Sequence, residues 1–214
     1  MGREPGGAVV EILVVCAVAQ ELGALRAREH VRVVPIGVGP VEAAIGAARA
    51  LAQHRCDVLI NAGIAGGFRD RCTIGDAVVV TRDDYAELGL EDGRAFALPP
   101  GSELVRTVEA HPRLLQPFLD GLIPAIAGRG VTSATVTSTT ARALVLAHRF
   151  RADVETMEGF AVMRAAQLAG VPAVQIRGVS NYVGDRETNE WNFGAGAAAA
   201  VATTEALLDV LLSE

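Results

Sequence analysis

The chain has 214 residues, enough for a complete core but too few for two domains of ordinary size, so we expect one domain spanning residues 1–214. Half of the residues are apolar, in runs shorter than the roughly 18 to 20 residues of a membrane span, which indicates a soluble protein with no membrane partner. The formal net charge of -6 argues against a nucleic-acid partner and favours a small molecule.

The cysteines and histidines argue against disulfides and metal sites. Cys16, Cys56 and Cys72 form no CxxC pair and are odd in number, so we expect reduced and mostly buried thiols. The four histidines lie far apart, without a partner at i+4 or a nearby carboxylate cluster, so we expect no metal and no cofactor. No cleavage site precedes the first strand-like segment, which makes a cytoplasmic location the expectation.

The first third of the chain alternates between strands and helices. Residues 9–19 form a continuous apolar run typical of a buried parallel strand, and residues 20–29 have helical spacing. Residues 31–39 read as a strand that ends in a glycine turn, followed by an Ala-rich helix over 41–54. Residues 57–68 predict another strand with a second glycine turn, so the pattern is that of a helix-covered parallel sheet.

The middle of the chain is less regular. Residues 75–82 predict a strand, and residues 83–101 are rich in turn formers. For residues 102–122 we expect one or two short helices interrupted by Pro112 and Pro117, because proline cannot donate a helical hydrogen bond.

The segment from 130 to 170 predicts a strand and two helices. Residues 130–138 alternate enough for the strand, and residues 140–150 have helical spacing. Within residues 154–170 a helix ends at Gly170. Its predicted buried face carries the small apolar residues Val162, Ala165, Ala166 and Ala169.

The end of the chain completes the α/β pattern. Residues 171–180 predict a strand, and residues 194–212 a long helix whose Ala-rich side packs on the sheet. The fold class we predict is α/β, a single three-layer domain with a central mixed, mostly parallel sheet flanked by helices.

Two glycine turns are candidates for ligand binding. "GVGPVE" at residues 37–42 lacks the third glycine of a dinucleotide fingerprint and follows the second strand, so a simple turn is favoured over NAD. No GxxxxGK[ST] motif is present to hold ATP. "NAGIAGGF" at residues 61–68 has three glycines that allow backbone amides to approach a ligand, and a plain turn is an equal alternative.

Three polar residues lie where predicted strands end or helices begin. Glu21 follows the first strand, Glu158 begins a helix, and Asn181 follows a late strand, so all three are expected to face one crevice. Each also has a structural interpretation: Glu21 as a solvated helix-start residue, Glu158 as an acid that stabilises a helix dipole, and Asn181 as a turn cap.

Three segments carry a family resemblance. "NAGIAGG", "VETMEGFAV" and "IRGVSNYVGD" resemble the signature segments of the nucleoside phosphorylase and nucleosidase superfamily, in the same order and over nearly the whole chain. Within it, the sequence resembles the futalosine hydrolase family, with the methylthioadenosine nucleosidases as the nearest relatives. The resemblance implies a nucleoside phosphorylase-like fold, a homo-oligomer, and an N-glycosidic hydrolase that releases hypoxanthine from the nucleoside futalosine in menaquinone biosynthesis.

The resemblance also implies roles for individual residues. Glu21 matches the acid that positions and activates water, and Ala19 and Gln20 replace acids that related nucleosidases carry. Met157 matches the residue that lies along the ribose, and Glu158 the carboxylate that accepts hydrogen bonds from the ribose hydroxyls. The implied substrate-binding positions are Gly63, Ile64, Ala65, the main chain near Val136, Met157 and Glu158.

The same comparison favours water over phosphate as the nucleophile. Ile64 stands where phosphorylase relatives carry Ser or Thr, and Arg69 and Arg71 come only after the glycine turn. A methylthioadenosine-type nucleosidase, a purine nucleoside phosphorylase and a non-catalytic nucleoside-binding protein stay open as alternatives.

Asn181 is the expected selectivity residue and, with Glu21, one of two expected catalytic residues. Relatives that cleave aminopurines carry aspartate at this position, whereas an amide can donate to a 6-oxo group and accept from N7–H, so hypoxanthine fits better than adenine. The proton for the leaving purine comes from Asp185 or from water, and Asp185 could equally form a turn. Trp191 and Phe193 cover the ligand or pack in the core.

Overall fold

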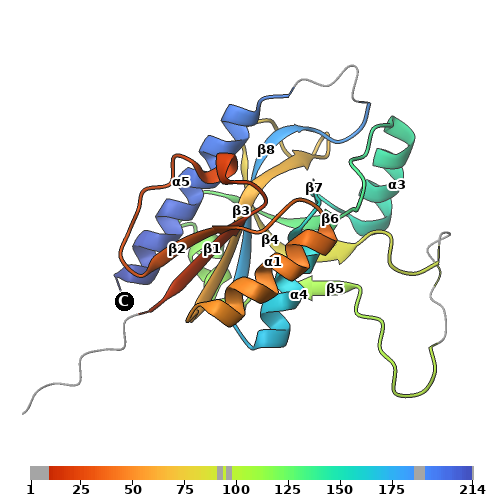
Figure 1. The fold of residues 1–214 in the computed structure, drawn as a ribbon. Coiled ribbons are helices and arrows are strands. Elements are labelled where there is room, and N and C mark those ends of the chain that lie inside the picture. Colours follow the sequence, from red (N-terminus) through yellow and green to blue (C-terminus); the bar gives the residue numbers. More distant parts are fainter. Residues whose placement is uncertain (1–9, 91–93, 95–97, 186–190, 214) are drawn as a thin grey trace, which may run out of the picture.

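The described chain is a mixed β-sheet with helices on both faces (Figure 1). The computed structural model describes residues 10–90, 94, 98–185 and 191–213. In chain order the elements are β1 (Ile12–Cys16), the 3-10 turn η1 (Ala19–Leu22), β2 (Val31–Pro35), α1 (Pro40–Gln53), β3 (Val58–Gly67), β4 (Ala77–Tyr85), β5 (Thr107–Glu109), α2 (Pro112–Leu119), β6 (Ile126–Thr132), α3 (Thr140–Phe150), β7 (Val154–Thr156), α4 (Gly159–Ala169), β8 (Ala173–Tyr182) and α5 (Phe193–Leu212).

The strands confirm the predicted mixed, mostly parallel sheet. The order is β2-β1-β3-β7-β6-β4-β5, and β8 pairs with both β3 and β4. The pairs β1–β2, β1–β3, β3–β8, β4–β6 and β6–β7 are parallel, whereas β3–β7, β4–β5 and β4–β8 are antiparallel. Because two routes join β3 to β4, one through β8 and one through β7 and β6, these strands close a ring among the described residues.

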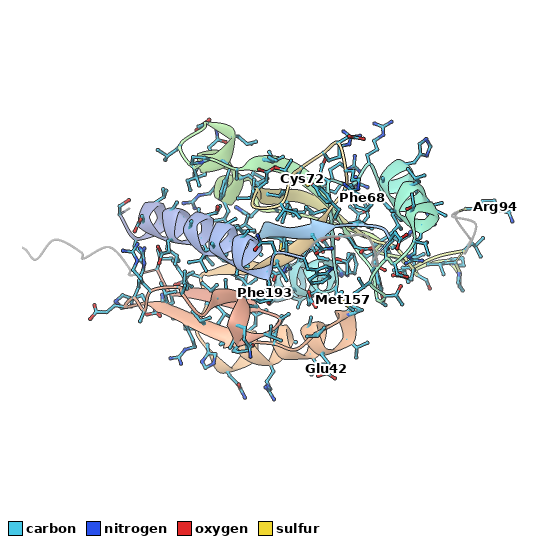
Figure 2. All side chains as sticks on the ribbon, turned by 90° about the horizontal axis from the view of Figure 1, so that it is seen from above. Glu42, Phe68, Cys72, Arg94, Met157 and Phe193 are labelled. Carbon is cyan, nitrogen blue, oxygen red and sulfur yellow. The ribbon has the colours of Figure 1, made fainter. Side chains whose placement is uncertain are left out.

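The helices form the outer layers. Helix α5 packs against β8 and β3, while α1 and α4 pack against each other. Figure 2 shows α5 and α1 on opposite sides of β1 and β2, so this part of the sheet is covered on both faces. Strand β1 is buried along its whole length, as the continuous apolar run predicted.

The predicted helix over residues 20–29 is wrong beyond Leu22. The structure has only the short turn η1 there, and Gly23 follows it. The side chains beyond the turn bind helix α5 instead: Arg26 Nε lies 2.9 Å from Glu205 Oε1, and Arg28 pairs with Asp209. These tertiary contacts compete with a weak local helical preference.

The prediction for residues 102–122 is partly wrong. Strand β5 was not expected there; it pairs with Arg82–Asp84 of β4, a contact far apart in sequence. Pro112 begins α2 rather than interrupting a helix, because the first helical position needs no N–H donor. Pro117 lies inside α2. Strand β4 continues to Tyr85, and residues 91–93 and 95–97 of the predicted irregular stretch lie outside the described residues.

The predictions for residues 130–170 need three corrections. Strand β6 ends at Thr132, so most of the alternating segment 130–138 is a loop. Strand β7 was not expected before α4. Val162 and Ala166 are buried on α4 as predicted and Gly170 ends the helix, but Ala165 is only half-buried and Ala169, in the last turn, is exposed.

The cysteines behave as predicted. All three are free thiols; Cys16 and Cys72 are buried and Cys56 is half-buried. Burial raises the pKa of Cys16 to about 12, which makes this thiol unreactive at neutral pH.

Helix α5 is long and apolar enough, by length and composition alone, to cross a membrane, although no membrane span was expected from the sequence. Its packing accounts for this composition. Leu207 and Leu208 are fully buried, and the backbone of α5 lies directly on β8. A Cβ atom on Gly178 of β8 would lie 1.8 Å from the carbonyl oxygen of Gly196 in α5, so only glycine permits this contact.

We expect Gly178→Ala to lower the free energy of unfolding by about 3 kcal/mol, because the added methyl group pushes α5 off the sheet. Urea unfolding of the variant and the wild type measures the difference. Gly194→Ala is the matched control in α5: its Cβ would meet only Asn192 Oδ1 at 3.8 Å, and we expect stabilisation of up to about 1 kcal/mol. Equal unfolding midpoints for Gly178→Ala and the wild type would contradict this account of the packing.

Candidate active site

A pocket opens where β3 changes neighbours. Strand β1 pairs with β3 as far as Asn61, and β7 joins the same sheet path only at Gly66. Strand β8 runs along β3 on its other side from Leu59 to Gly67. Residues 62–65 of β3 therefore border a gap, in which no described strand pairs with this edge.

The structure brings most of the predicted site residues to this pocket. Those that line it are Glu21, Ile64, Ala65, Val136, Met157, Glu158 and Asn181. Gly63 is not a lining residue; it lies beneath the pocket, where a Cβ atom would be 2.8 Å from both Glu21 Oε1 and Arg177 Nη1. Its missing side chain lets these two charged groups approach the strand.

Glu21 is held by backbone donors. Its Oε1 accepts from the N–H of Ile64 at 3.1 Å, a donor that the sheet leaves unpaired at the gap, and its Oε2 accepts from the N–H of Val18 at 3.2 Å. The residue is only 4% exposed, so it is not the solvated helix-start glutamate of the alternative interpretation. Lone pairs remain on both oxygens for a ligand or a water molecule.

Arg177 is a functional candidate that the sequence analysis missed. It lies in the middle of β8 and is fully buried, and its three guanidinium nitrogens have no hydrogen-bond partner among the described residues. Its charge lowers the pKa of the Glu158 carboxyl. The signal was available, since an arginine interrupts the apolar run "VPAVQIRGVS". A buried cation whose donors are unsatisfied indicates a water molecule or ligand group beside it, although Arg177 itself does not line the pocket.

Glu158 lies at the start of α4, beside the start of α1. Its Oε1 accepts from the N–H of Gly39 at 2.9 Å. Burial raises the pKa of Glu158, whereas Arg177 and the Gly39 donor lower it and Glu21 raises it further. The carboxylate is thus a buried acceptor with positive potential on one side and the pocket on the other.

A buried polar network fixes the turn that carries Glu158. Thr132 Oγ1 accepts from the N–H of Phe160 at 2.7 Å, and Thr156 Oγ1 accepts from the N–H of Gly159 at 3.2 Å. Thr132 in turn donates to Asp83 at 2.9 Å. Burial raises the pKa of Asp83 to about 6. These bonds satisfy the first amides of α4 and set the position of Glu158.

Asn181 reaches the pocket from the end of β8. Its Nδ2 donates to the carbonyl oxygen of Tyr182 at 3.0 Å, and its Oδ1 accepts from Ser180 Oγ at 2.8 Å. One N–H and one lone pair of the amide remain for a ligand. The side chain is therefore oriented, but its hydrogen-bonding capacity is not exhausted.

Glu155 also lines the pocket, and sequence reasoning gave it no role. It belongs to β7, the strand that was not expected, and it is 8% exposed. The signal that could have found it is a second carboxylate within the segment "VETMEGFAV".

The two aromatic residues predicted near the ligand lie at the pocket, whereas Asp185, the candidate acid, does not. Trp191 and Phe193 line the pocket and are 44% and 39% exposed, so they border the site rather than filling the core. In the view of Figure 2, the label of Phe193, at the start of α5, lies close to that of Met157. Asp185 is exposed and does not line the pocket.

The groups expected at a metal or phosphate site are not assembled at this pocket. Within the described ranges, no three or more His, Cys, Asp or Glu side chains are placed to hold a metal ion. Arg69 stacks over the ring of Tyr182 at 4.3 Å and, with Arg71, lines a different surface hollow. The lining residues of the pocket include no arginine or lysine.

Comparisons with known proteins agree with this geometry. Residues 11–213 match the family model described as the phosphorylase superfamily. A futalosine hydrolase from Streptomyces coelicolor is 37% identical over 185 residues, which is 83% of this chain and 78% of the relative. A futalosine hydrolase from Thermus thermophilus is 33% identical over 159 residues, 72% of this chain and 71% of the relative.

Solved structures share the fold. The native futalosine hydrolase of Helicobacter pylori superposes with a TM-score of 0.79 at 15% identity, over 94% of this chain and 98% of that chain. The relatives and the structures also include 5'-methylthioadenosine/S-adenosylhomocysteine nucleosidases. At such low identity the structural likeness shows the fold, and the predicted nucleoside phosphorylase-like fold is confirmed.

We expect Glu158→Gln to raise the free energy of unfolding at pH 8, because it removes a charge that burial disfavours while its amide oxygen can still accept from Gly39. The pKa of Glu158 is higher in the folded than in the unfolded chain, so wild-type stability falls as pH rises through this range. The gain is therefore largest above the folded-state pKa and disappears below the unfolded value of about 4.3. Denaturant unfolding across a pH series measures it.

Glu29→Gln is the control for this prediction, because Glu29 is exposed in the turn before β2. We expect its stability to follow that of the wild type at every pH. A Glu158→Gln variant that is less stable than the wild type at pH 8 would show that pairing with Arg177 outweighs the cost of burial.

Proposed function

The chain belongs to the phosphorylase superfamily, and on this premise we propose that it hydrolyses the N-ribosidic bond of futalosine to hypoxanthine and dehypoxanthine futalosine. The observation that carries this proposal is the meeting of Glu21, Glu158 and Asn181 in one pocket at the end of β3 and β8. The bond breaks through a ribosyl cation, so the site must supply water, stabilise the sugar and assist the departing purine.

Glu21 is the proposed general base for the attacking water. Two backbone donors fix its carboxylate and leave lone pairs directed at the pocket. Arg177 lies against the same strand beneath Gly63, so its unsatisfied N–H groups can donate to a water molecule that Glu21 accepts from. A donor on one side and an acceptor on the other orient the water for attack.

Glu158 and Met157 are the proposed sugar-binding residues. The Glu158 carboxylate can accept hydrogen bonds from two ribose hydroxyls, and its negative charge favours the developing cation. The Gly39 amide holds one of its oxygens in place. Met157 presents an apolar side chain to the same part of the pocket.

Asn181 is the proposed catalytic contact to the purine. Its remaining N–H can donate to the 6-oxo group, while its remaining lone pair accepts from N7–H as the base departs. The amide supplies no proton itself, and Asp185 lies outside the pocket, so water is the proposed proton source. Gly63, Ile64, Ala65 and the main chain near Val136 are proposed to shape the space around the nucleoside.

A phosphorylase is the less favoured alternative. Ile64 presents an apolar side chain to the pocket where a phosphate would need a hydroxyl, and Arg69 stacks on Tyr182 instead. A methylthioadenosine-type nucleosidase would need an acceptor for the exocyclic amine, a role for which aspartate suits better than the Asn181 amide. A non-catalytic nucleoside-binding protein would bind the nucleoside but release no free base in an activity assay.

We also propose that the chain is one domain that works in the cytoplasm as a homo-oligomer, on the menaquinone pathway that futalosine implies. Apolar side chains at the pocket rim support the assembly. Val38 at the pocket is 53% exposed, and Val41 and Ile45, one turn apart on α1, are 67% and 59% exposed. A second copy of the chain would cover this surface.

The purified chain is expected to release hypoxanthine from futalosine in buffer without phosphate, because water is the proposed nucleophile. Product analysis by liquid chromatography measures the release. Glu21→Gln should lower kcat by about 100-fold to 10,000-fold, the usual contribution of a general base, whereas Glu29→Gln, at an exposed residue in the turn before β2, should leave it unchanged. A requirement for phosphate, or adenine nucleosides as the preferred substrates, would favour the alternatives, and a folded chain without turnover would favour the binding protein.

Asn181→Asp should reverse part of the base preference. We expect kcat/KM for futalosine to fall by about tenfold to a hundredfold, the cost of leaving a buried group unpaired, and kcat/KM for its 6-amino analogue to rise. Steady-state assays on both nucleosides measure the ratio. If the ratio does not move, Asn181 does not read the base.

A further inference from the structure

Three residues form a row across the sheet at the inner end of the pocket. Gly66 of β3 is paired with Glu155 of β7 on one side and with Asn181 of β8 on the other. Directly paired residues point to the same face of a sheet. Two strand spacings of about 4.8 Å separate the outer residues, and Gly66 carries no side chain between them. Val183 packs over Gly66, where a Cβ atom would lie 2.9 Å from its Cγ2, and Glu155 and Asn181 each line the pocket with a polar group on either side of this point.

The environment of Glu155 makes it a hydrogen-bond acceptor. Its Oε2 accepts from the N–H of Thr137 at 3.2 Å, and its Oε1 accepts from Thr137 Oγ1. A carboxylate has about four acceptor sites, so capacity remains toward the pocket. Because Glu155 takes up the Thr137 N–H, this edge of the pocket presents a carboxylate rather than a backbone donor.

Neighbouring charges act on Glu155 in both directions. Burial raises its pKa, the Thr137 donors and Arg142 lower it, and Glu87 raises it. Arg142 of α3 donates to Thr137 Oγ1 at 3.3 Å and pairs with Glu87 at 2.6 Å. The donors of Thr137 thus hold the carboxylate, and Glu155 is one of the residues that line the pocket.

We propose, resting on the proposed cleavage of a hypoxanthine nucleoside, that Glu155 is a second specificity-determining residue whose carboxylate accepts the N1–H of a 6-oxopurine. Hypoxanthine carries a hydrogen on N1, whereas adenine has a lone pair there. A carboxylate accepts from the first and repels the second. Asn181 and Glu155 then read adjacent edges of the purine: Asn181 contacts O6 and N7, and Glu155 contacts N1–H.

Binding of the free bases tests this assignment. Isothermal titration calorimetry with hypoxanthine and with adenine compares the wild type and Glu155→Gln. We expect the wild type to prefer hypoxanthine. In Glu155→Gln, hypoxanthine affinity should fall by about tenfold to a hundredfold, and adenine affinity should rise because the new amide can donate to N1.

Glu87→Gln is the matched control, because it is the same change in the same network but outside the pocket lining. It should leave the preference unchanged. An unchanged preference in Glu155→Gln, or an equal shift in both variants, overturns the proposal. A wild type that binds adenine as tightly as hypoxanthine also overturns it, even if Glu155→Gln does not fold. Base binding involves no bond cleavage, so failure to hydrolyse futalosine would sink the proposed function while these affinities still decide the role of Glu155.

Discussion

The site depends on one unpaired stretch of strand edge. Between Asn61 and Gly66, β3 has lost β1 as a neighbour and has not yet gained β7. A buried backbone N–H without a partner costs about 1 to 3 kcal/mol, and at Ile64 the Glu21 carboxylate meets this need. The gap therefore creates the pocket and, through its unsatisfied backbone, fixes the acid that the proposed reaction requires. The hydrogen bond from the Ile64 N–H to Glu21 thus satisfies the strand edge and also positions the proposed base.

The buried charged groups around this gap disfavour folding but suit the proposed binding of a polar ligand. Arg177 is buried with its donors unsatisfied within the described chain, and the pKa of Glu158 is raised by burial. A buried charged group lowers the stability of the folded chain unless an opposite charge or a hydrogen-bonding group pairs with it. Contacts around the site offset this loss of stability. Asp83, Thr132 and Thr156 form a hydrogen-bonded network that fixes the start of α4. Helix α5 packs closely on β8 through the Gly178–Gly196 contact. Well-packed helices and strands thus hold a site in which some buried hydrogen-bonding groups lack partners among the described residues.

Sequence patterns predicted those parts of the fold that local chemistry determines. The buried runs of β1, β3 and β8, the Ala-rich helix α1 and the Gly170 helix end were all predictable. Strands β5 and β7 were not, because three residues carry no period and their pairing partners are distant in sequence. The same contrast between local and distant signals explains which site residues were predicted and which were missed. Glu21, Glu158 and Asn181 stood at element ends, where strands of a parallel sheet converge, whereas Arg177 lies inside a strand and Glu155 in a strand that was not foreseen.

Ile64 contributes to the proposed site through both its backbone and its side chain. Its N–H holds Glu21, the proposed base for water, and its side chain lines the pocket where a hydroxyl would be needed to hold phosphate. A hydroxyl at this position would leave the backbone bond to Glu21 intact but add a donor for an anion. Yet no arginine or lysine lines the pocket itself, and the guanidinium of Arg177 is buried beneath Gly63 rather than beside Ile64 in the lining. The preference for water over phosphate therefore rests on the whole lining of the gap, and a change at Ile64 alone would not convert a hydrolase site into a phosphorylase site.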